Sequence, residues 1–183
     1  MTTRPDILVV GAGYVGLATA VFLADRGYPT TVVEKNCEIV EGLRRKRLHF
    51  HEPFLAETLK KVVANGSLTV IQPEAQPYQK ADLIFIAIDS ANRRTWQMRL
   101  EPFEQMAGWI GGVKRRVPPT VVLKSTNVLG FTQHVRELLD STPYGKAAKL
   151  LVSPEFLREG LALEDTVHPS RVVIGARDKH DAA

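Results

Sequence analysis

The chain has 183 residues, of which 44% are hydrophobic and 24% are charged, as expected for one globular domain with a sizeable core. Lys and Arg exceed Asp and Glu by 24 to 20, and the basic runs are expected to be solvated surface, because no nucleic-acid-binding signature or metal-ligand spacing accompanies them. The single cysteine, Cys37, excludes an internal disulfide and suits a reducing compartment.

The first predicted element lies in an uncharged run, residues 7–24, that imitates a membrane span or signal peptide. Glycines at 11, 13 and 16 interrupt the run, and its periodicity changes from a continuous apolar "ILVV" to helical spacing. We therefore predict a buried strand at 7–10, a glycine turn and a helix at 14–26. The chain is expected to be cytoplasmic, with neither membrane nor nucleic acid as a partner.

Short β-rich runs and helical patterns alternate along the rest of the chain. Further strands are predicted at 30–34, 67–71, 83–88, 120–124, 150–153 and 171–174, and further helices at 39–45, 53–65, 102–110 and 131–139. This alternation predicts an α/β fold: one Rossmann-like domain with a doubly wound, mostly parallel sheet. The domain is expected to span residues 1–178, followed by a frayed polar tail at 179–183.

The sequence "GAGYVG" at residues 11–16 has the spacing G-x-G-x-x-G, and it follows a predicted strand and opens a predicted helix. In this context the first glycine permits a tight turn, the second lets a pyrophosphate approach the backbone, and the third lets helix and strand pack closely. Glu34, eighteen residues after Gly16, ends the next strand and can accept the ribose hydroxyls of a dinucleotide. That carboxylate favours NAD over NADP, whereas Lys35 beside it acts in the opposite direction.

Ligands of doubly wound sheets lie beyond the carboxyl ends of the strands. The residues that follow the strands are therefore candidates for a site: Glu34, residues 89–90, residues 124–126 and the octapeptide "SPEFLREG" at 153–160. In the octapeptide we predict a helix start, with Ser153 as N-cap and Pro154 as first helical residue. This start would direct Glu155 and Glu159 toward the edge of the sheet where cofactor and substrate meet.

Three blocks of sequence carry a family resemblance: "GAGYVGL", "KST" at 124–126 with Gly130 and Phe131 behind it, and "SPEFLREG…HPSRVVIG" at 153–175. Together they resemble the N-terminal domain of the UDP-glucose/GDP-mannose dehydrogenase family, in particular its bacterial UDP-glucose 6-dehydrogenases. The resemblance implies an NAD-dependent double oxidation in nucleotide-sugar metabolism and polysaccharide biosynthesis. A primary alcohol becomes an aldehyde and then, through a cysteine thioester, a carboxylate, as in the conversion of UDP-glucose to UDP-glucuronate.

The resemblance also implies roles for individual residues, and it implies no metal. Cofactor contacts are expected from Gly11, Gly13, Tyr14, Val15, Gly16, Glu34, Ser90, Ser125, Thr126 and Glu159. Glu155 would assist proton transfer and thioester hydrolysis, and Thr126 would position the water. Substrate contacts are expected from Glu155, Phe156, Leu157 and Arg158.

Several positions depart from the family pattern. The usual V-G-T-P appears with Asp89 and Ser90 in place of its glycine and threonine, an added acid that should weaken cofactor binding. The usual E-P-G-L has Phe54 in place of its glycine, and Val128 stands where a proline usually follows K-S-T.

The family continues into a C-terminal domain that carries the nucleophilic cysteine and most of the UDP site, and Cys37 is predicted on the adenosine side of the fold, where it cannot replace that nucleophile. We therefore expect this chain alone not to complete the reaction. Alternatives are a domain that serves GDP-mannose or another nucleotide sugar, and a non-catalytic NAD-binding or partner-binding module. A homodimer, or pairing with a chain that supplies the second domain, is also compatible with the sequence.

Overall fold

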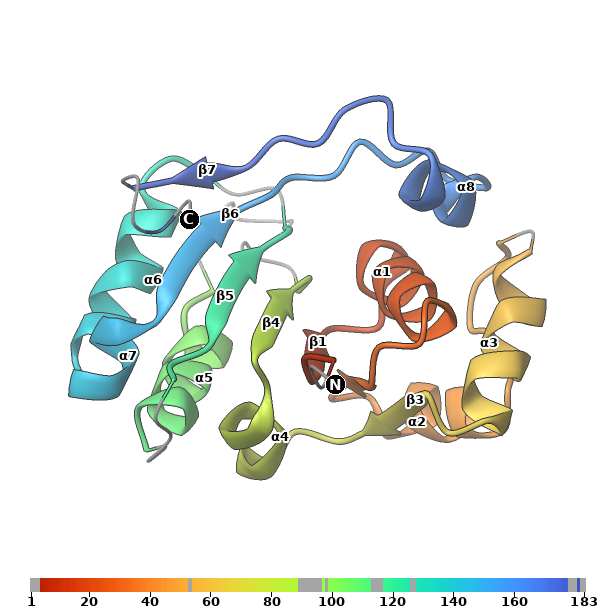
Figure 1. The fold of residues 1–183 in the computed structure, drawn as a ribbon, viewed down its shortest axis with the longest axis horizontal. Coiled ribbons are helices and arrows are strands. Elements are labelled where there is room, and N and C mark those ends of the chain that lie inside the picture. The colour runs from red at the N-terminus through yellow and green to blue at the C-terminus, as the bar shows by residue number, and fades with distance from the viewer. Residues whose placement is uncertain are drawn as a thin grey trace.

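The computed structural model describes residues 4–52, 54–88, 97, 99–112, 117–125, 128–177 and 181. They form a sheet with the strand order β3-β2-β1-β4-β5-β6-β7, in which every pairing is parallel except that of β7 with β6 (Figure 1). The strands are β1 (Ile7–Val10), β2 (Thr30–Val33), β3 (Leu68–Ile71), β4 (Leu83–Ile86), β5 (Thr120–Leu123), β6 (Lys149–Val152) and β7 (Gly175–Ala176). The predicted Rossmann-like, mostly parallel fold is confirmed.

Helices connect and cover these strands. In the described part of the chain they are α1 (Tyr14–Asp25), α2 (Cys37–Arg44), α3 (Leu55–Ala64), α4 (Ala75–Lys80), α5 (Glu101–Gly111), α6 (Phe131–Asp140), α7 (Pro143–Ala147) and α8 (Ala162–Val167). The sequence patterns predict the five longest and miss α4, α7 and α8, each of six residues or fewer. None of these helices is long and apolar enough to cross a membrane, and the uncharged run at 7–24 forms β1, the glycine turn and most of α1.

Alternate side chains of the strands enter two separate cores, which explains why the central strands are apolar throughout. From β1, Ile7 and Val9 pack in a cluster with side chains of α1, α2 and α3. Leu8 and Val10 point to the other face and pack with side chains of α4, α5 and α6. Both faces of the sheet are thus covered by helices, and the edge formed by the carboxyl ends of the strands is left for ligands.

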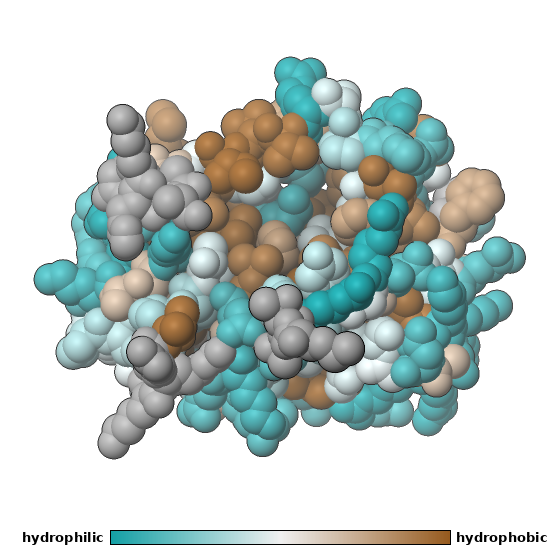
Figure 2. All heavy atoms as spheres, in the orientation of Figure 1, coloured by the Kyte–Doolittle hydropathy of each residue, from teal (hydrophilic) through white to brown (hydrophobic). Residues whose placement is uncertain are grey.

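Two predictions for the end of the chain are wrong. Residues 153–158 form no helix, and the helix that follows begins only at Ala162. The last strand is Gly175–Ala176 and not 171–174, because β7 pairs with Leu151 and Val152 through those two residues. Val172, Val173 and Ile174 are exposed, and Figure 2 shows apolar side chains gathered on this face over the segment between α8 and β7.

Candidate functional site

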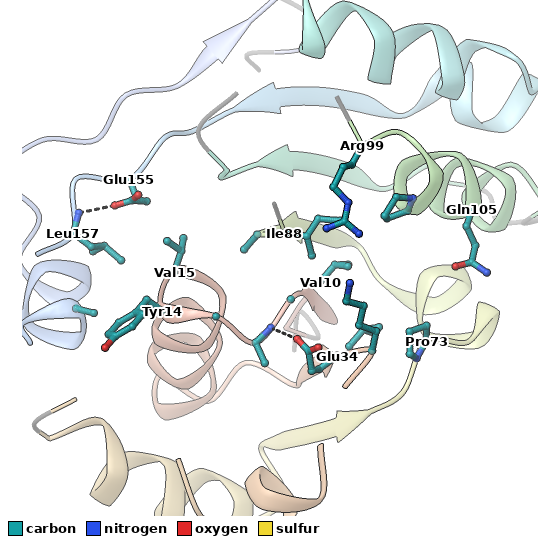
Figure 3. Close-up of a pocket in the computed structure, with 18 of the residues that line it drawn as sticks. Val10, Tyr14, Val15, Glu34, Pro73, Ile88, Arg99, Gln105, Glu155 and Leu157 are labelled. Carbon is teal, nitrogen blue, oxygen red and sulfur yellow. Dashed lines mark hydrogen bonds between the residues drawn. The ribbon is translucent and has the colours of Figure 1, made fainter. Parts of the chain in front are cut away.

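A pocket of about 920 Å³ opens at the carboxyl ends of the central strands. Its walls come from the glycine turn after β1, from Glu34 and Lys35 after β2, from Ala87 and Ile88 after β4, and from residues 155 and 157–159 after β6 (Figure 3). The strand order reverses between β1 and β4, the point at which ligands of doubly wound sheets bind. The pocket therefore lies where the fold alone places a ligand.

In the glycine turn, Gly11 and Gly16 are tightly packed, whereas Gly13 has open space beside it. Gly11 has a φ of +101°, and a Cβ there would overlap the carbonyl oxygen of Ala87, whereas a Cβ at Gly16 would overlap the carbonyl oxygen of Gly11. A Cβ at Gly13 would have no described residue within 4 Å other than its chain neighbours. Gly13 is also the N-cap of α1, and it has no side chain to cap the first N–H groups of that helix. The turn thus packs tightly against β4 and presents a free helix N-terminus to the pocket, which fits the pyrophosphate of a dinucleotide.

Glu34 braces the glycine turn from β2. One oxygen of its carboxylate accepts the backbone N–H of Ala12 at 3.0 Å (Figure 3), and the other accepts the backbone N–H of Asn36 at 2.9 Å. Asn36 in turn caps α2 with its side chain. A carboxylate offers about four acceptor positions, so Glu34 retains capacity for the hydroxyls of an adenosine ribose.

Phe50 and His49 lie beside Tyr14 in the first turn of α1, and no sequence pattern predicts either of them. The rings of Tyr14 and Phe50 are stacked with centroids 4.2 Å apart, and His49 meets Phe50 edge-on at 4.7 Å. Burial lowers the pKa of His49, while the nearby Glu34 carboxylate and a hydrogen bond to the backbone of Ala12 partly offset this shift. No motif marks His49 or Phe50, because their partners lie far away in sequence.

On the β6 side of the pocket, the lining includes Glu155, for which the resemblance implies a role in proton transfer that stays a prediction. Its Oε2 accepts the backbone N–H of Leu157 at 2.6 Å, which holds the carboxylate against its own segment (Figure 3). Burial lowers the pKa of Lys124, which follows β5, and the charge of Glu155 opposes that shift. A carboxylate and an ammonium from neighbouring strands are therefore close enough to interact at this edge.

The segment that carries Glu155 is fixed at its far end by Glu52. Glu52 is only 3% exposed, and its carboxylate accepts the backbone N–H groups of Gly160, at 2.9 Å, and Ala162. The sequence shows Glu52 only as the first residue of an E-P-G-L-like motif, which gives no indication of this contact.

The guanidinium of Arg158 is already paired with an acid in this chain. Its Nη2 and Nε donate to Asp165 at 2.7 and 3.1 Å, and its backbone N–H donates to the same carboxylate at 2.8 Å. These hydrogen bonds raise the pKa of Arg158 and lower the pKa of Asp165. The pairing holds Arg158 against α8, although the residue still lines the pocket.

The pocket brings together most of the predicted site residues, and their individual roles remain predictions. It is lined by Gly11, Gly13, Tyr14, Val15, Glu34, Glu155, Leu157, Arg158 and Glu159. Asp89, Ser90 and Thr126 lie outside the described residues.

Three predicted site residues lie away from the lining of this pocket in the described part of the chain. Gly16 packs against the glycine turn, and the hydroxyl of Ser125 donates to the carbonyl of Ile88 at 2.5 Å. Phe156 is 47% exposed, with the guanidinium of Arg171 4.9 Å from its ring centroid.

One wall of the pocket was not predicted at all. It comes from α4, from α5 and from the residues just before each helix: Pro73, Tyr78, Arg99, Glu101, Pro102, Gln105 and Trp109. The rings of Tyr78 and Trp109 lie 4.9 Å apart and connect the two helices. The four-residue spacing of Glu101, Gln105 and Trp109 places them on one face of α5, but nothing in the sequence shows that this face borders a pocket.

Proteins of known function resemble this chain over nearly its whole length. It is 32% identical over 178 residues to the UDP-glucose 6-dehydrogenase YwqF of Bacillus subtilis, and 32% identical over 176 residues to the UDP-glucose 6-dehydrogenase of Pseudomonas aeruginosa. These alignments cover 97% and 94% of this chain but only 40% and 39% of the relatives. The chain thus spans about two fifths of the length of these relatives.

Solved structures also resemble this chain over nearly its whole length. The GDP-mannose dehydrogenase of Pseudomonas aeruginosa superposes with a TM-score of 0.84 at 27% identity, covering 96% of this chain and 42% of that one. A UDP-glucose dehydrogenase from the archaeon Pyrobaculum islandicum gives 0.83 at 32% identity, with coverages of 99% and 43%. The family described as "UDP-glucose/GDP-mannose dehydrogenase family, NAD binding domain" matches residues 5–183. The chain therefore belongs to the UDP-glucose/GDP-mannose dehydrogenase family, whose NAD-binding domain it comprises.

Proposed function

We propose that this chain is the cofactor domain of a nucleotide-sugar 6-dehydrogenase that oxidises UDP-glucose to UDP-glucuronate. One observation supports the proposal above the others: the glycine turn and the segment that carries Glu155 line the same pocket, although they lie near opposite ends of the chain. A dinucleotide lying on the turn would extend its nicotinamide end toward this segment. A substrate that meets the nicotinamide there would have the carboxylate of Glu155 beside it.

The chemistry of the proposed reaction needs a proton acceptor beside the cofactor. Oxidation of a primary alcohol removes a hydride and a proton, and NAD, when bound, accepts the hydride. Glu155, held by the N–H of Leu157 and close to the charge of Lys124, is the group of this chain that would take the proton or orient a water. Thr126 is proposed as its partner for the water.

The choice of UDP-glucose rests on the curated relatives, several of which are named UDP-glucose 6-dehydrogenases at about 30% identity. The solved structure of a GDP-mannose dehydrogenase is as similar in fold as that of a UDP-glucose dehydrogenase, so the fold does not select the sugar. The remaining three fifths of the relatives' length would supply the groups that recognise the nucleotide and the cysteine that the resemblance implies.

The catalytic part of the proposal is tested in a chimera in which this chain replaces the matched N-terminal part of the Bacillus subtilis relative. We expect the chimera to form NADH from UDP-glucose. Glu155→Gln should slow turnover by about 10²-fold or more, the usual contribution of a general acid or base, and leave the Kd for NAD within about twofold. Glu57→Gln, which changes an exposed acid of α3, is the matched control and should change neither quantity.

Each failure of this experiment has a distinct meaning. Turnover on GDP-mannose but not on UDP-glucose would keep the reaction and replace the substrate. Binding of NAD without NADH formation from any nucleotide sugar would support the non-catalytic NAD-binding module instead. Unchanged turnover in the Glu155→Gln chimera would remove Glu155 from the proton transfer.

A further inference from the structure

The pocket wall formed by α4, α5 and the residues just before them lies far from the proton transfer proposed above. Figure 3 shows Pro73 and Gln105 at one end of the pocket and Glu155 at the other, with Val10 and Glu34 between them. The pocket therefore continues past Glu34 on the side away from Glu155, and this part of it has no assigned ligand group.

The parts of a dinucleotide follow one another in the same order as these residues. In a doubly wound sheet the pyrophosphate lies at the N-terminus of the first helix, and the adenosine ribose meets the carboxylate that ends the second strand. Here those positions are the glycine turn and Glu34, and the nicotinamide end extends toward Glu155. The base attached to the adenosine ribose would then lie beyond Glu34, in the part of the pocket between Pro73 and α5.

Gln105 is the side chain of this wall that can both donate and accept hydrogen bonds at the edge of a base. Its amide is exposed and makes no hydrogen bond with the residues that the structure describes. Glu101 and Trp109 lie one helical turn before and after it, but a carboxylate offers only acceptors and an indole only a donor. A carboxamide offers both side by side, which matches the N6 amino group and the N7 atom of adenine.

We propose that Gln105 is a specificity-determining residue of the cofactor site and recognises the adenine base with two hydrogen bonds. Its Oε1 accepts from the N6 amino group, and its Nε2 donates to N7. Hypoxanthine has acceptors at both O6 and N7, so the same amide can satisfy only one of them. The inference rests on the NAD-binding role of the pocket and adds recognition of the base to it.

Calorimetric titration of the chain with NAD and with nicotinamide hypoxanthine dinucleotide tests the inference, because the second compound carries an oxygen in place of the N6 amino group. The wild-type chain should bind NAD at least about fivefold more tightly, the lower end of the discrimination by a bidentate pair, since Gln105 is exposed. Gln105→Ala should bring the two Kd values within about twofold of each other. Gln79→Ala removes an exposed glutamine of α4 outside the pocket lining and, as the matched control, should keep the preference for NAD.

A second variant separates base recognition from a general effect on the site. Gln105→Arg should reverse the preference, because a guanidinium donates to both O6 and N7 of a 6-oxopurine. Added positive charge or altered packing of α5 would instead change both Kd values by the same factor.

The inference is overturned if the wild-type chain binds the two dinucleotides within about twofold of each other, or if Gln105→Ala keeps the wild-type preference. A Gln105→Arg variant that still prefers NAD would also overturn it. Failure of both dinucleotides to bind to the folded wild-type chain would overturn the NAD-binding role itself and this inference with it.

Discussion

At the scale of single residues, the three glycines of the turn have different physical tasks. Gly11 and Gly16 are required by packing, because a Cβ at either position would overlap a backbone oxygen. Gly13 has an ordinary extended conformation, with a φ of −69° and a ψ of −174°, and open space around it. The fold itself would therefore tolerate a side chain at Gly13, and only a ligand on the turn requires a glycine there.

This difference predicts that an alanine at position 13 weakens NAD binding, whereas an alanine at position 16 destabilises the fold. Gly13→Ala should change the free energy of unfolding by less than about 0.5 kcal/mol but raise the Kd for NAD by about tenfold or more, because the new methyl group occupies the path of the pyrophosphate. Gly16→Ala should destabilise the chain by about 1–3 kcal/mol through overpacking. Urea unfolding and NAD titration of both variants measure these effects, and equal NAD affinity in Gly13→Ala and wild type would contradict the assignment.

Phe54 has a left-handed backbone conformation, which is strained for a residue with a side chain. It has a φ of +64° at the N-cap of α3, where the family pattern has glycine, and its side chain is 72% exposed. Phe54→Gly should therefore stabilise the chain by about 1 kcal/mol, since glycine adopts this conformation without a steric penalty. Phe54→Ala, which keeps the strain, is the control for the lost ring. A Phe54→Gly variant no more stable than Phe54→Ala in urea unfolding would show that the left-handed conformation costs nothing here.

At the scale of elements, local rules predicted the long helices well and the segment after β6 poorly. Ser153 and Pro154 satisfy the rules for a helix start, yet residues 153–158 form no helix and α8 begins at Ala162. The contacts that hold the start of α8 come instead from a distant residue: the backbone N–H groups of Gly160 and Ala162 donate to Glu52, which lies 110 residues before Ala162 in the chain. A capping rule that considers only neighbours in sequence cannot find such a contact.

Glu52 should therefore control the order of the segment between Glu155 and α8. Glu52→Gln leaves one acceptor where two N–H groups need one each, and it should destabilise the chain by about 1–3 kcal/mol. Hydrogen exchange at the amides of Gly160 and Ala162 should accelerate more than exchange in β1. Glu57→Gln again serves as the control. If the exchange rates of the two amides kept their ratio to those of β1, Glu52 would have only a global role.

At the scale of the whole molecule, the fold class could be predicted because alternating apolar strands and helices leave few arrangements. The position of the ligand edge followed from the same rule, and the glycine turn, Glu34 and Glu155 do line one pocket there. The wall formed by Arg99, Gln105 and Trp109 could not be predicted, because its place depends on how α5 packs against the sheet and not on any local pattern.

The central claim, that this pocket binds NAD, is tested most directly by calorimetric titration of the chain with NAD, with thermal unfolding followed in parallel. We expect saturable binding of one NAD per chain and an increase in stability of about 2.7 kcal/mol at a free NAD concentration of about 100 times Kd. A cooperatively folded chain that shows neither saturable heat nor a shift of its unfolding transition up to about 1 mM NAD would contradict the claim.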